Sequence, residues 1–295
     1  MNMIEIRDVT KRYGENKGIF DLSFNIAKGE VFGFLGPNGA GKTTAIRHLL
    51  GFLNPDKGTC IINGKDCRTH AADIQKELGY LPGEIAFIDQ MTGTQFLKFM
   101  ASMRRMEDFS KADDLLSYFE LNPKNKIKKM SKGMKQKLGL VSAFMHDPEI
   151  LILDEPTSGL DPLMQSKFVN LVLQEKRQGK TILMSSHSFE EVERTCDRVA
   201  IIRNGRLVAT ETVSVLKQSQ KKTYRVTLDS PEAAVRFADE ALDVMDVHDC
   251  VVTVSVSGDL TPFIRIMAGY HIIGLDVSTQ SLEEIFMHYY GGTAQ

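Results

Sequence analysis

One short segment of this sequence fits the pattern G-x-x-x-x-G-K-[ST] and lies between an apolar run and a helical pattern. Glycines let such a segment turn so that its backbone N–H groups converge, and the following helix adds partial positive charge at its N-terminus. In this setting Lys42 reaches the β- and γ-phosphates of a nucleotide, and the Thr43 hydroxyl is a ligand for Mg²⁺. The predicted phosphate site consists of Gly36, Pro37, Asn38, Gly39, Ala40, Gly41, Lys42, Thr43 and Thr44.

Short apolar runs alternate with helical patterns around this segment. The strand-like runs include residues 31–35, 150–153 and 181–185. The helical patterns include residues 44–52, 162–177 and 189–196. Strands that alternate with helices indicate a parallel sheet, so the fold class is α/β.

Local patterns add turns and a helical region. The pairs Asn63-Gly64 and Asn204-Gly205 are typical of hairpin turns. Residues 91–145 are mostly helical in pattern. They contain an apolar stripe that we expect to pack in the core, formed by Phe96, Leu97, Phe99, Met100 and Met103.

Composition and charge exclude several classes of protein. Hydrophobic residues make up 42% of the chain and charged residues 25%, and no apolar run approaches the ~18 residues that span a bilayer. The first residues are too rich in charge for a secretory signal, which predicts a cytosolic protein. The formal net charge of −2 gives no electrostatic reason to expect a nucleic-acid partner. The cysteines lack metal-binding spacing and are expected to be reduced thiols, at Cys60, Cys67, Cys196 and Cys250.

Charge is unevenly distributed along the chain. From Lys221 to Gln295 there are 5 Lys and Arg residues against 11 Asp and Glu residues, which predicts a domain boundary near residue 220. We expect a first domain over residues 1–218, with a helical subdomain at about 90–145, and an accessory α+β domain over 219–295. The tail follows the order strand, helix, strand, strand, helix, strand, which is typical of a small ferredoxin-like fold.

A second group of chemically active residues follows the apolar run 150–153, which ends in Asp154, Glu155 and Pro156. Ionised carboxylates at the end of a buried strand need a cation or hydrogen-bond donors. We therefore assign Asp154 to Mg²⁺, directly or through water, and Glu155 to the general base that activates the attacking water. Neighbouring strand residues point to opposite faces, so both carboxylates serve one site only if the chain bends, as Pro156 indicates.

With these motifs, residues 1 to about 215 resemble the nucleotide-binding domain of ATP-binding-cassette (ABC) transporters. The segment 131–136, S-K-G-M-K-Q, is similar to the family's signature, and 158–161 is similar to its D-loop. His187 corresponds to the family's switch histidine, and Tyr13 to the aromatic residue that stacks on adenine. The resemblance implies a P-loop NTPase fold with antiparallel β and α-helical subdomains, and ATP and Mg²⁺ as cofactors.

The resemblance also implies a mechanism. Each of two ATP molecules would lie between the phosphate loop of one chain and the signature of another, in a homodimer or a heterodimer with a second ATPase subunit. Ser131 and Gly133 would bind the γ-phosphate of the partner's ATP, and Asp161 of the D-loop would lie at the nucleotide. The residues of the catalytic step would be Lys42, Glu155 and His187.

Two places depart from the family pattern. In the signature, Lys132 and Met134 replace a glycine and a glutamine, whereas Ser131 is kept. The glutamine of the family's Q-loop falls at Gly83, which has no side chain to reach the metal or water. Glu84 either substitutes for it as an oxygen ligand or is a surface carboxylate.

The tail resembles a subgroup of the family. Its last helical pattern, residues 281–289, includes the sequence S-L-E-E-I-F and looks like the appendage of bacterial ABC exporter ATPases for drugs, antibiotics and bacteriocins. Ser281 and Glu284 form a capping box in this pattern. Its apolar face either completes the small domain's core or forms a dimer contact.

One cassette without a spanning helix predicts an ATPase subunit that drives a separate polytopic permease, an exporter, from the cytoplasmic face of the cell membrane. The permease would dock on residues 80–110. An alternative is a soluble ABC ATPase that acts on ribosomes or DNA, but the chain lacks the second cassette or sustained heptads typical of that class. A non-catalytic binding module is disfavoured by the presence of Lys42, Asp154, Glu155 and His187.

Overall fold

The computed structural model describes residues 1–295 except 16, 219–221, 257 and 280–295. The chain divides into two compact units, Met1–Glu211 and Thr212–Gln295. This division lies a few residues before the boundary expected from the charge distribution. No helix within the described ranges has both the length and the apolarity that a membrane span requires.

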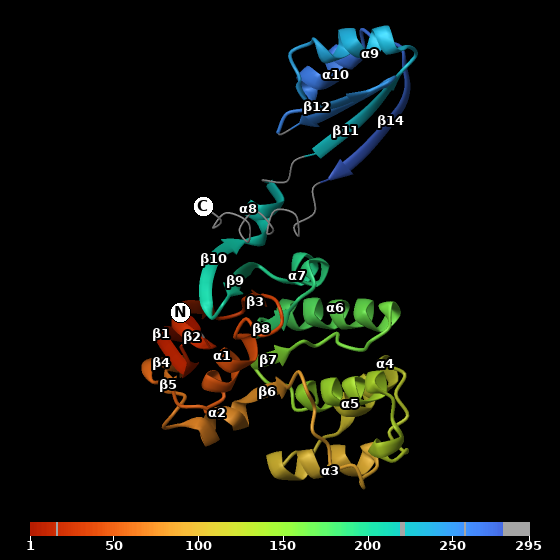
Figure 1. Ribbon diagram of the computed structural model, residues 1–295. Helices are drawn as coiled ribbons and strands as arrows, with labels where there is room; N and C mark the ends of the chain where they lie inside the picture. The colour runs from red at the N-terminus through yellow and green to blue at the C-terminus, as the bar shows by residue number, and fades with distance from the viewer. Residues whose placement is uncertain (16, 219–221, 257, 280–295) are drawn as a thin grey trace. The chain divides into compact units, whose positions relative to one another are not determined.

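A six-stranded sheet forms the centre of the first unit (Figure 1). Its strands, in spatial order, are β10 (Arg206–Thr212), β9 (Arg198–Arg203), β3 (Val31–Leu35), β8 (Thr181–Ser186), β7 (Ile150–Asp154) and β6 (Leu78–Leu81). The pairs β9–β3, β3–β8, β8–β7 and β7–β6 are parallel, which confirms the predicted parallel sheet. Every residue of β3, β7 and β8 is buried, as expected for strands covered on both faces.

Four helices of the first unit connect the strands of this sheet or lie beside them. They are α1 (Lys42–Leu49), α2 (Ala71–Glu77), α6 (Pro162–Arg177) and α7 (Phe189–Thr195). The helix expected over residues 44–52 therefore begins and ends earlier than predicted. It ends because Gly51 adopts a left-handed backbone with φ of +70°, where a Cβ atom would lie 2.5 Å from that of Ala71.

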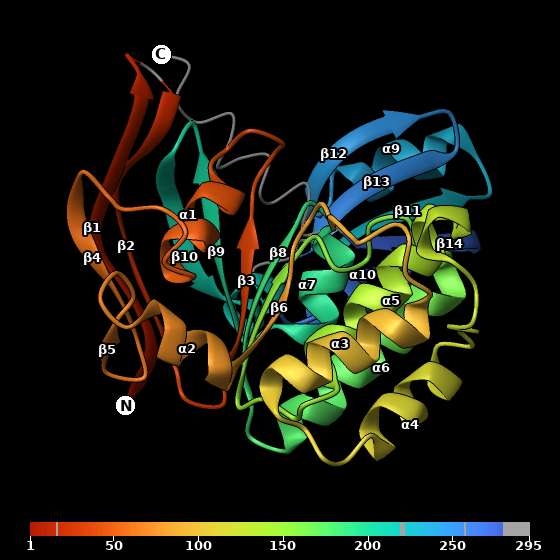
Figure 2. The same cartoon turned by 90° about the horizontal axis from the view of Figure 1, so that it is seen from below.

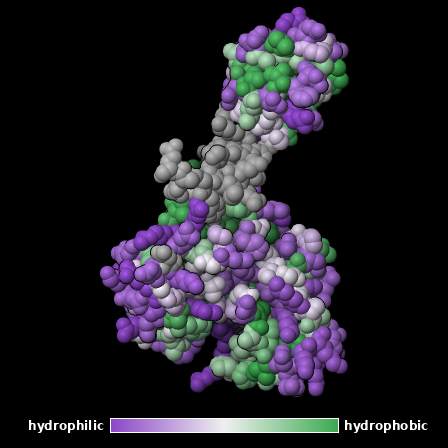
Figure 3. Space-filling view, in the orientation of Figure 1, coloured by the Kyte–Doolittle hydropathy of each residue, from purple (hydrophilic) through white to green (hydrophobic). Residues whose placement is uncertain are grey.

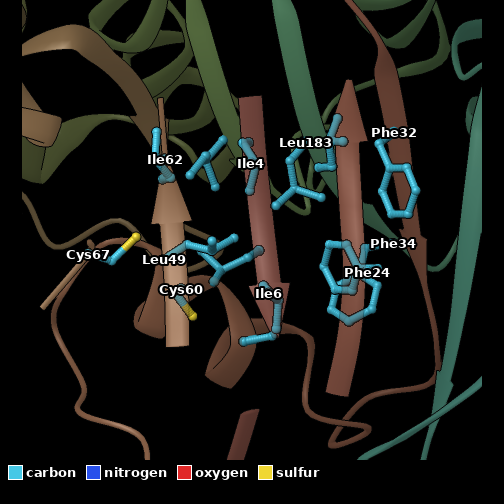
Figure 4. Packing of buried hydrophobic residues seen from close by; sticks show 14 of the residues in the cluster. Ile4, Ile6, Phe24, Phe32, Phe34, Leu49, Cys60, Ile62, Cys67 and Leu183 are labelled. Carbon is cyan, nitrogen blue, oxygen red and sulfur yellow. The ribbon is translucent and has the colours of Figure 1, made fainter. Parts of the chain in front are cut away.

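A four-stranded antiparallel sheet packs against α1. Its strands, in spatial order, are β2 (Lys17–Ala27), β1 (Asn2–Gly14), β4 (Lys57–Ile62) and β5 (Lys65–Asp66). Ile4 and Ile6 from β1 lie in one buried cluster with Leu49 of α1 and Leu183 of β8 (Figure 4). Phe24 stacks on Phe32 with ring centroids 5.2 Å apart, which joins this sheet to β3.

The helices of the predicted helical region lie together on the side of the six-stranded sheet that is away from the antiparallel sheet (Figure 2). They are α3 (Gly93–Arg104), α4 (Ser110–Tyr118), the 3-10 turn η1 (Ile127–Lys129) and α5 (Lys132–Phe144). Thr92 and Gln95 form a capping box at the start of α3. The expectation that the whole apolar stripe of α3 is core was wrong. Leu97 is buried, but Phe99 is 40% and Met103 68% exposed, because the stripe is wider than the face that α3 turns towards its neighbours.

The second unit contains α8 (Val213–Gln218) and a four-stranded sheet. Its other elements are β11 (Lys222–Leu228), α9 (Pro231–Ala238), β12 (Asp243–His248), β13 (Val251–Val256), α10 (Thr261–Met267) and β14 (Ile272–Thr279). The sheet has the order β12-β13-β11-β14 with antiparallel pairs, and from β11 to β14 the elements follow the predicted order. Its core includes Val226, Phe237, Val252 and Phe263. The helix expected over 281–289, with its capping box, lies outside the described residues.

Candidate nucleotide-binding and catalytic site

A cavity of about 510 Å³ lies over the segment between β3 and α1. Gly41, the N-cap of α1, has φ of +111°, a conformation that favours glycine and that turns the chain into the helix. The cavity is lined by Tyr13, Lys17, Gly18, Pro37, Asn38, Gly39, Gly41, Lys42, Thr43, Thr44, Glu155, Asn204 and Gly205. Most of the predicted phosphate-binding residues therefore lie around one cavity, together with Tyr13 and Glu155, whereas Gly36 and Ala40 are buried and do not line it.

Lys42 is almost completely buried at the base of this cavity, with 6% of its surface exposed. Its Nζ donates hydrogen bonds to the carbonyl oxygens of Gly36 at 2.6 Å and Pro37 at 3.3 Å. It also lies 3.1 Å from Oε1 of Glu155. Because these acceptors hold the ammonium group in place, Lys42 supplies a fixed positive charge beside the loop.

Thr43 and Asp154 meet where α1 begins and β7 ends. The Thr43 hydroxyl donates to Oδ2 of Asp154 at 2.8 Å, and the Ser185 hydroxyl donates to Oδ1 of the same carboxylate. Asp154 is 1% exposed, so its charge is compensated by these hydroxyl donors. This pair of oxygen-bearing side chains is the one that the sequence assigns to Mg²⁺.

Glu155 is the residue at which the chain bends after β7. Its φ of +50° is left-handed, which is uncommon for a residue other than glycine, and its N–H donates to the Ser185 hydroxyl at 3.0 Å and the Ser185 carbonyl at 3.2 Å. The bend required by the sequence argument is therefore present, at Glu155 itself. With this bend Glu155 lines the cavity, and Asp154 lies behind the cavity-lining Thr43 and accepts its hydroxyl hydrogen bond.

The Glu155 carboxylate lies between two cationic or proton-bearing groups. One oxygen is next to Lys42, and Nδ1 of His187 lies 2.5 Å from the other oxygen. Since an ionised carboxylate only accepts hydrogen bonds, Nδ1 carries the proton in this contact. His187 is 66% exposed in its side chain, whereas that of Glu155 is 19% exposed. The contact thus joins a partly buried carboxylate to a histidine at the surface.

The signature and D-loop residues do not line this cavity. Ser131 is the N-cap of α5 and accepts a hydrogen bond from the Met134 N–H at 3.2 Å. Asp161 is the N-cap of α6 and accepts from the Met164 N–H. Gly133 faces the D-loop, because a Cβ atom there would lie 2.8 Å from the carbonyl oxygen of Gly159. Both segments therefore lie next to each other, outside the cavity that their own chain forms.

Gly83, which stands at the position of the family's Q-loop glutamine, lies next to Asp154, the assigned metal ligand. A Cβ atom on Gly83 would lie 3.2 Å from Oδ2 of Asp154, and the side chain of Glu84 is exposed. Tyr80 is a nearby residue that the sequence did not indicate. Burial, together with the negative charge of Asp154, raises the pKa of Tyr80 to about 12. Besides the Thr43 and Ser185 hydroxyls, the surroundings of Asp154 thus include the backbone at Gly83 and a neutral phenol.

The sequence did not indicate a role for two further buried side chains. Gln136, in the signature helix, is 4% exposed and donates to the carbonyl oxygens of Pro156 at 2.8 Å and Glu155 at 3.3 Å. Glu191 is 6% exposed and accepts a hydrogen bond from Ser186, the residue before His187. Gln136 lies within the quoted signature, but no spacing in the sequence shows what its side chain holds.

Comparison with known proteins agrees with this geometry. A family profile described as "ABC transporter" matches residues 19–158. The bacitracin transport ATP-binding protein of Bacillus licheniformis is 33% identical over 300 residues, covering 98% of this chain and 98% of its own length. The linearmycin resistance ATP-binding protein of Bacillus subtilis (strain 168) is 32% identical over 308 residues, covering 99% of each.

A solved structure of the ATP-binding subunit of an ABC transporter superimposes with a TM-score of 0.67. It is 30% identical and covers 73% of this chain and 92% of its own. Full-length relatives and this structure agree on one family. The chain belongs to the ABC transporter ATP-binding proteins, the subunits that bind and hydrolyse ATP for transport.

Proposed function

We propose that this chain drives an exporter, as one of two ATP-binding subunits that close around two ATP molecules. The observation that carries the proposal is the cavity lined by Lys42, Thr43 and Glu155. Two further residues contact this set directly, Asp154 through the Thr43 hydroxyl and His187 through the Glu155 carboxylate. Export is supported by relatives named for bacitracin transport and linearmycin resistance, which match almost the whole chain. The alternative of an ATPase for ribosomes or DNA has no supporting observation of this kind.

The residues around Asp154 fit Mg²⁺. The Thr43 hydroxyl and the Asp154 carboxylate are oxygen donors whose atoms lie 2.8 Å apart, and hard oxygen ligands are the ones that Mg²⁺ prefers. Thr43 would bind the ion directly and Asp154 directly or through water, with phosphate oxygens and water as the other ligands. When bound, Mg²⁺ supplies positive charge that neutralises the phosphate oxygens.

The chain's own side chains then divide the catalytic work. Lys42 binds the β- and γ-phosphate oxygens in place of its present carbonyl acceptors. Glu155 accepts the proton of the attacking water, since its carboxylate is partly buried and its backbone is fixed by Ser185. His187 orients the Glu155 carboxylate and the water through the contact at Nδ1, so that its role is position and charge.

Dimerisation follows from the residues that lie outside the cavity. ATP-binding subunits of this family dimerise and pair with permeases. Ser131, Gly133 and Asp161 line no part of the cavity in their own chain, and we propose that they bind the ATP held by the partner subunit. Tyr13 lines the cavity and is 56% exposed, and we propose that its ring stacks on adenine.

We propose that the permease docks at the groove between α2 and α3. This groove has a volume of about 620 Å³ and is lined by Ala72, Gln75, Lys76, Met100, Met103, Arg104 and Arg105. Exposed Phe99 and Met103 add apolar surface on α3, and Figure 3 shows hydrophobic surface in this region of the first unit. It lies within residues 80–110 for the most part, and docking there would hold the subunit at the cytoplasmic face of the membrane.

The two expected domains complete the proposal. Residues 1–218 would form the ATP-binding domain, with residues 90–145 as its helical subdomain, and residues 219–295 an accessory domain. We propose a ferredoxin-like fold for the accessory domain, supported by its element order and by the strand order β12-β13-β11-β14. One face of its sheet packs on α9 and α10 through Tyr224, Phe237 and Phe263.

The decisive experiment is Glu155→Gln with Mg-ATP, followed by light scattering. Removing the base while keeping the phosphate site is expected to trap an ATP-bound dimer that hydrolyses ATP poorly. The measurement is made on the purified subunit and on the complex with its permease, with Lys28→Ala as a surface control. A chain that stays monomeric in both settings at saturating nucleotide, or that hydrolyses ATP at the original rate, would contradict the proposal.

A further inference from the structure

Glu191 is a buried carboxylate in the first turn of α7 that has no part in the mechanism above. Its N–H is capped by the Ser188 hydroxyl, and 6% of its surface is exposed. Oε2 accepts a hydrogen bond from the Ser186 hydroxyl at 2.6 Å and a longer one from the Thr157 hydroxyl at 3.4 Å. One oxygen atom thus contacts two segments, the end of β8 at Ser186 and the segment that follows β7 at Thr157.

These two segments carry the residues that meet at the site. Ser186 precedes His187, and its Oγ also accepts a hydrogen bond from the Ser188 N–H at 2.9 Å. Thr157 follows Glu155 by two positions. Ser185 joins the same two segments nearer the strands, through Asp154 and the Glu155 N–H. The His187–Glu155 contact therefore lies on loops that are tied together at two levels.

The Glu191 carboxylate is held at a cost in stability. Its Oε1 is buried without a hydrogen-bond partner among the described residues. Burial, and to a lesser degree the charge of Glu155, raises the pKa of Glu191 to about 7 against the hydrogen bonds of Ser186 and Thr157. A buried carboxylate with one oxygen lacking a hydrogen-bond donor destabilises the fold. Packing alone therefore does not account for a glutamate at position 191.

We propose that Glu191 is a positioning residue for hydrolysis, which holds the segment carrying His187 at a fixed distance from the segment carrying Glu155. This inference rests on the proposed roles of Glu155 and His187. Glu191 contacts neither the phosphate loop nor the assigned metal ligands. Its removal should therefore loosen the His187–Glu155 contact and leave nucleotide binding unchanged.

The test compares Glu191→Ala with Glu191→Gln in the full-length chain. Glu191→Ala is expected to lower kcat for ATP hydrolysis roughly ten- to a hundred-fold while KM and the Kd for ATP change by less than about twofold. Glu191→Gln keeps an acceptor oxygen for Ser186 and should recover most of the rate. Glu190→Gln is the matched control, because that carboxylate lies on the same helix turn and its side chain is 80% exposed.

A double-mutant cycle separates positioning from general destabilisation. In a His187→Ala background, measured by single turnover, the loss caused by Glu191→Ala should fall to about twofold, because the group that it positions is gone. Amide hydrogen exchange gives a readout apart from activity. The amides of residues 157–158 and 186–188 should exchange faster in Glu191→Ala, whereas α5 should exchange at the original rate.

The outcomes that would overturn the inference are distinct from those that would overturn the proposed function. Equal losses with and without His187, faster exchange throughout the first unit, or an unchanged kcat would each reject a positioning role. If Glu191→Ala does not fold, Ser186→Ala is measured instead. It removes the hydroxyl that donates to Glu191, and the same outcomes would reject the positioning role. A fully active Glu155→Gln would instead reject the catalytic assignment on which the inference rests.

Discussion

Lys42 and Glu155 form an ion pair across the phosphate cavity, with Nζ of the lysine 3.1 Å from Oε1 of the carboxylate. Lys42 belongs to the first turn of α1, and Glu155 to the bend after β7. The pair therefore joins the phosphate loop to the segment that carries the proposed general base. Because Lys42 is 6% exposed, water screens this interaction much less than it would screen a pair at the surface.

Lys42→Ala is expected to raise the Kd for ATP at least about tenfold, because it removes the charge-assisted contacts to the phosphates. It also leaves the Glu155 carboxylate without its cation. Fluorescence titration with an ATP analogue measures the effect. Lys28→Ala serves as the control, since Lys28 is 61% exposed in its side chain and lies 4.0 Å from Glu149. Equal affinities for both variants would contradict the role of Lys42.

The phosphate loop and the carboxylate pair could be predicted because each is a contiguous motif. In such a motif the residue order alone fixes which groups meet, as for Lys42 and Thr43 on the loop. Glu155 shows a feature that the residue order alone does not predict. The sequence indicates that a bend is needed and points to Pro156, whereas the structure places the left-handed turn at Glu155 and holds it through Ser185, 30 positions away.

Asp154→Asn is expected to raise the Mg²⁺ concentration for half-maximal hydrolysis about tenfold or more, since an amide is a poorer ligand for a hard cation than a carboxylate. The amide keeps an oxygen that accepts from Thr43 or Ser185, which limits the damage to the fold. A Mg²⁺ titration at constant ATP measures the shift. Asp73→Asn, an exposed carboxylate on α2, is the control. An unchanged Mg²⁺ requirement would show that Asp154 does not hold the ion.

Long-range contacts explain what the sequence could not supply. Gln136 and Pro156 are 20 positions apart, and Ser185 and Asp154 are 31 positions apart, so no local spacing relates them. The absence of a side chain at Gly83 is visible in the sequence. Its approach to Asp154 is not, because it depends on the pairing of β6 with β7. Strand existence was predictable, but strand neighbours were set by tertiary packing.

Gln136→Leu is expected to lower the free energy of unfolding by about 1–3 kcal/mol, because two buried carbonyl oxygens lose their donor. These are the carbonyl groups of Glu155 and Pro156, so the substitution destabilises the backbone of the proposed base. Urea unfolding followed by circular dichroism measures the change. Gln174→Leu, at an exposed position of α6, should change the value by less than about 0.5 kcal/mol. Similar effects for both variants would mean that the Gln136 contacts contribute nothing.

Glu191→Gln should stabilise the fold in a pH-dependent way. The pKa of Glu191 is raised from an ordinary 4.5 to about 7 in the folded chain, chiefly by burial. Between these two values the folded protein keeps the proton that the unfolded chain has released, so the stability of the original protein falls as pH rises. The amide of Glu191→Gln cannot ionise, so the stability of this variant does not fall with pH for this reason.

The stability difference between Glu191→Gln and the original protein should therefore be small near pH 4.5, grow as pH rises to about 7, and then level off. At 1.36 kcal/mol per pKa unit the full gain is at most about 3 kcal/mol. Unfolding curves at several pH values give the difference, and other titrating groups cancel because both proteins share them. Glu190→Gln should show no such trend, since that carboxylate is exposed. A difference that is constant across this range would mean that Glu191 is ionised in the folded protein throughout.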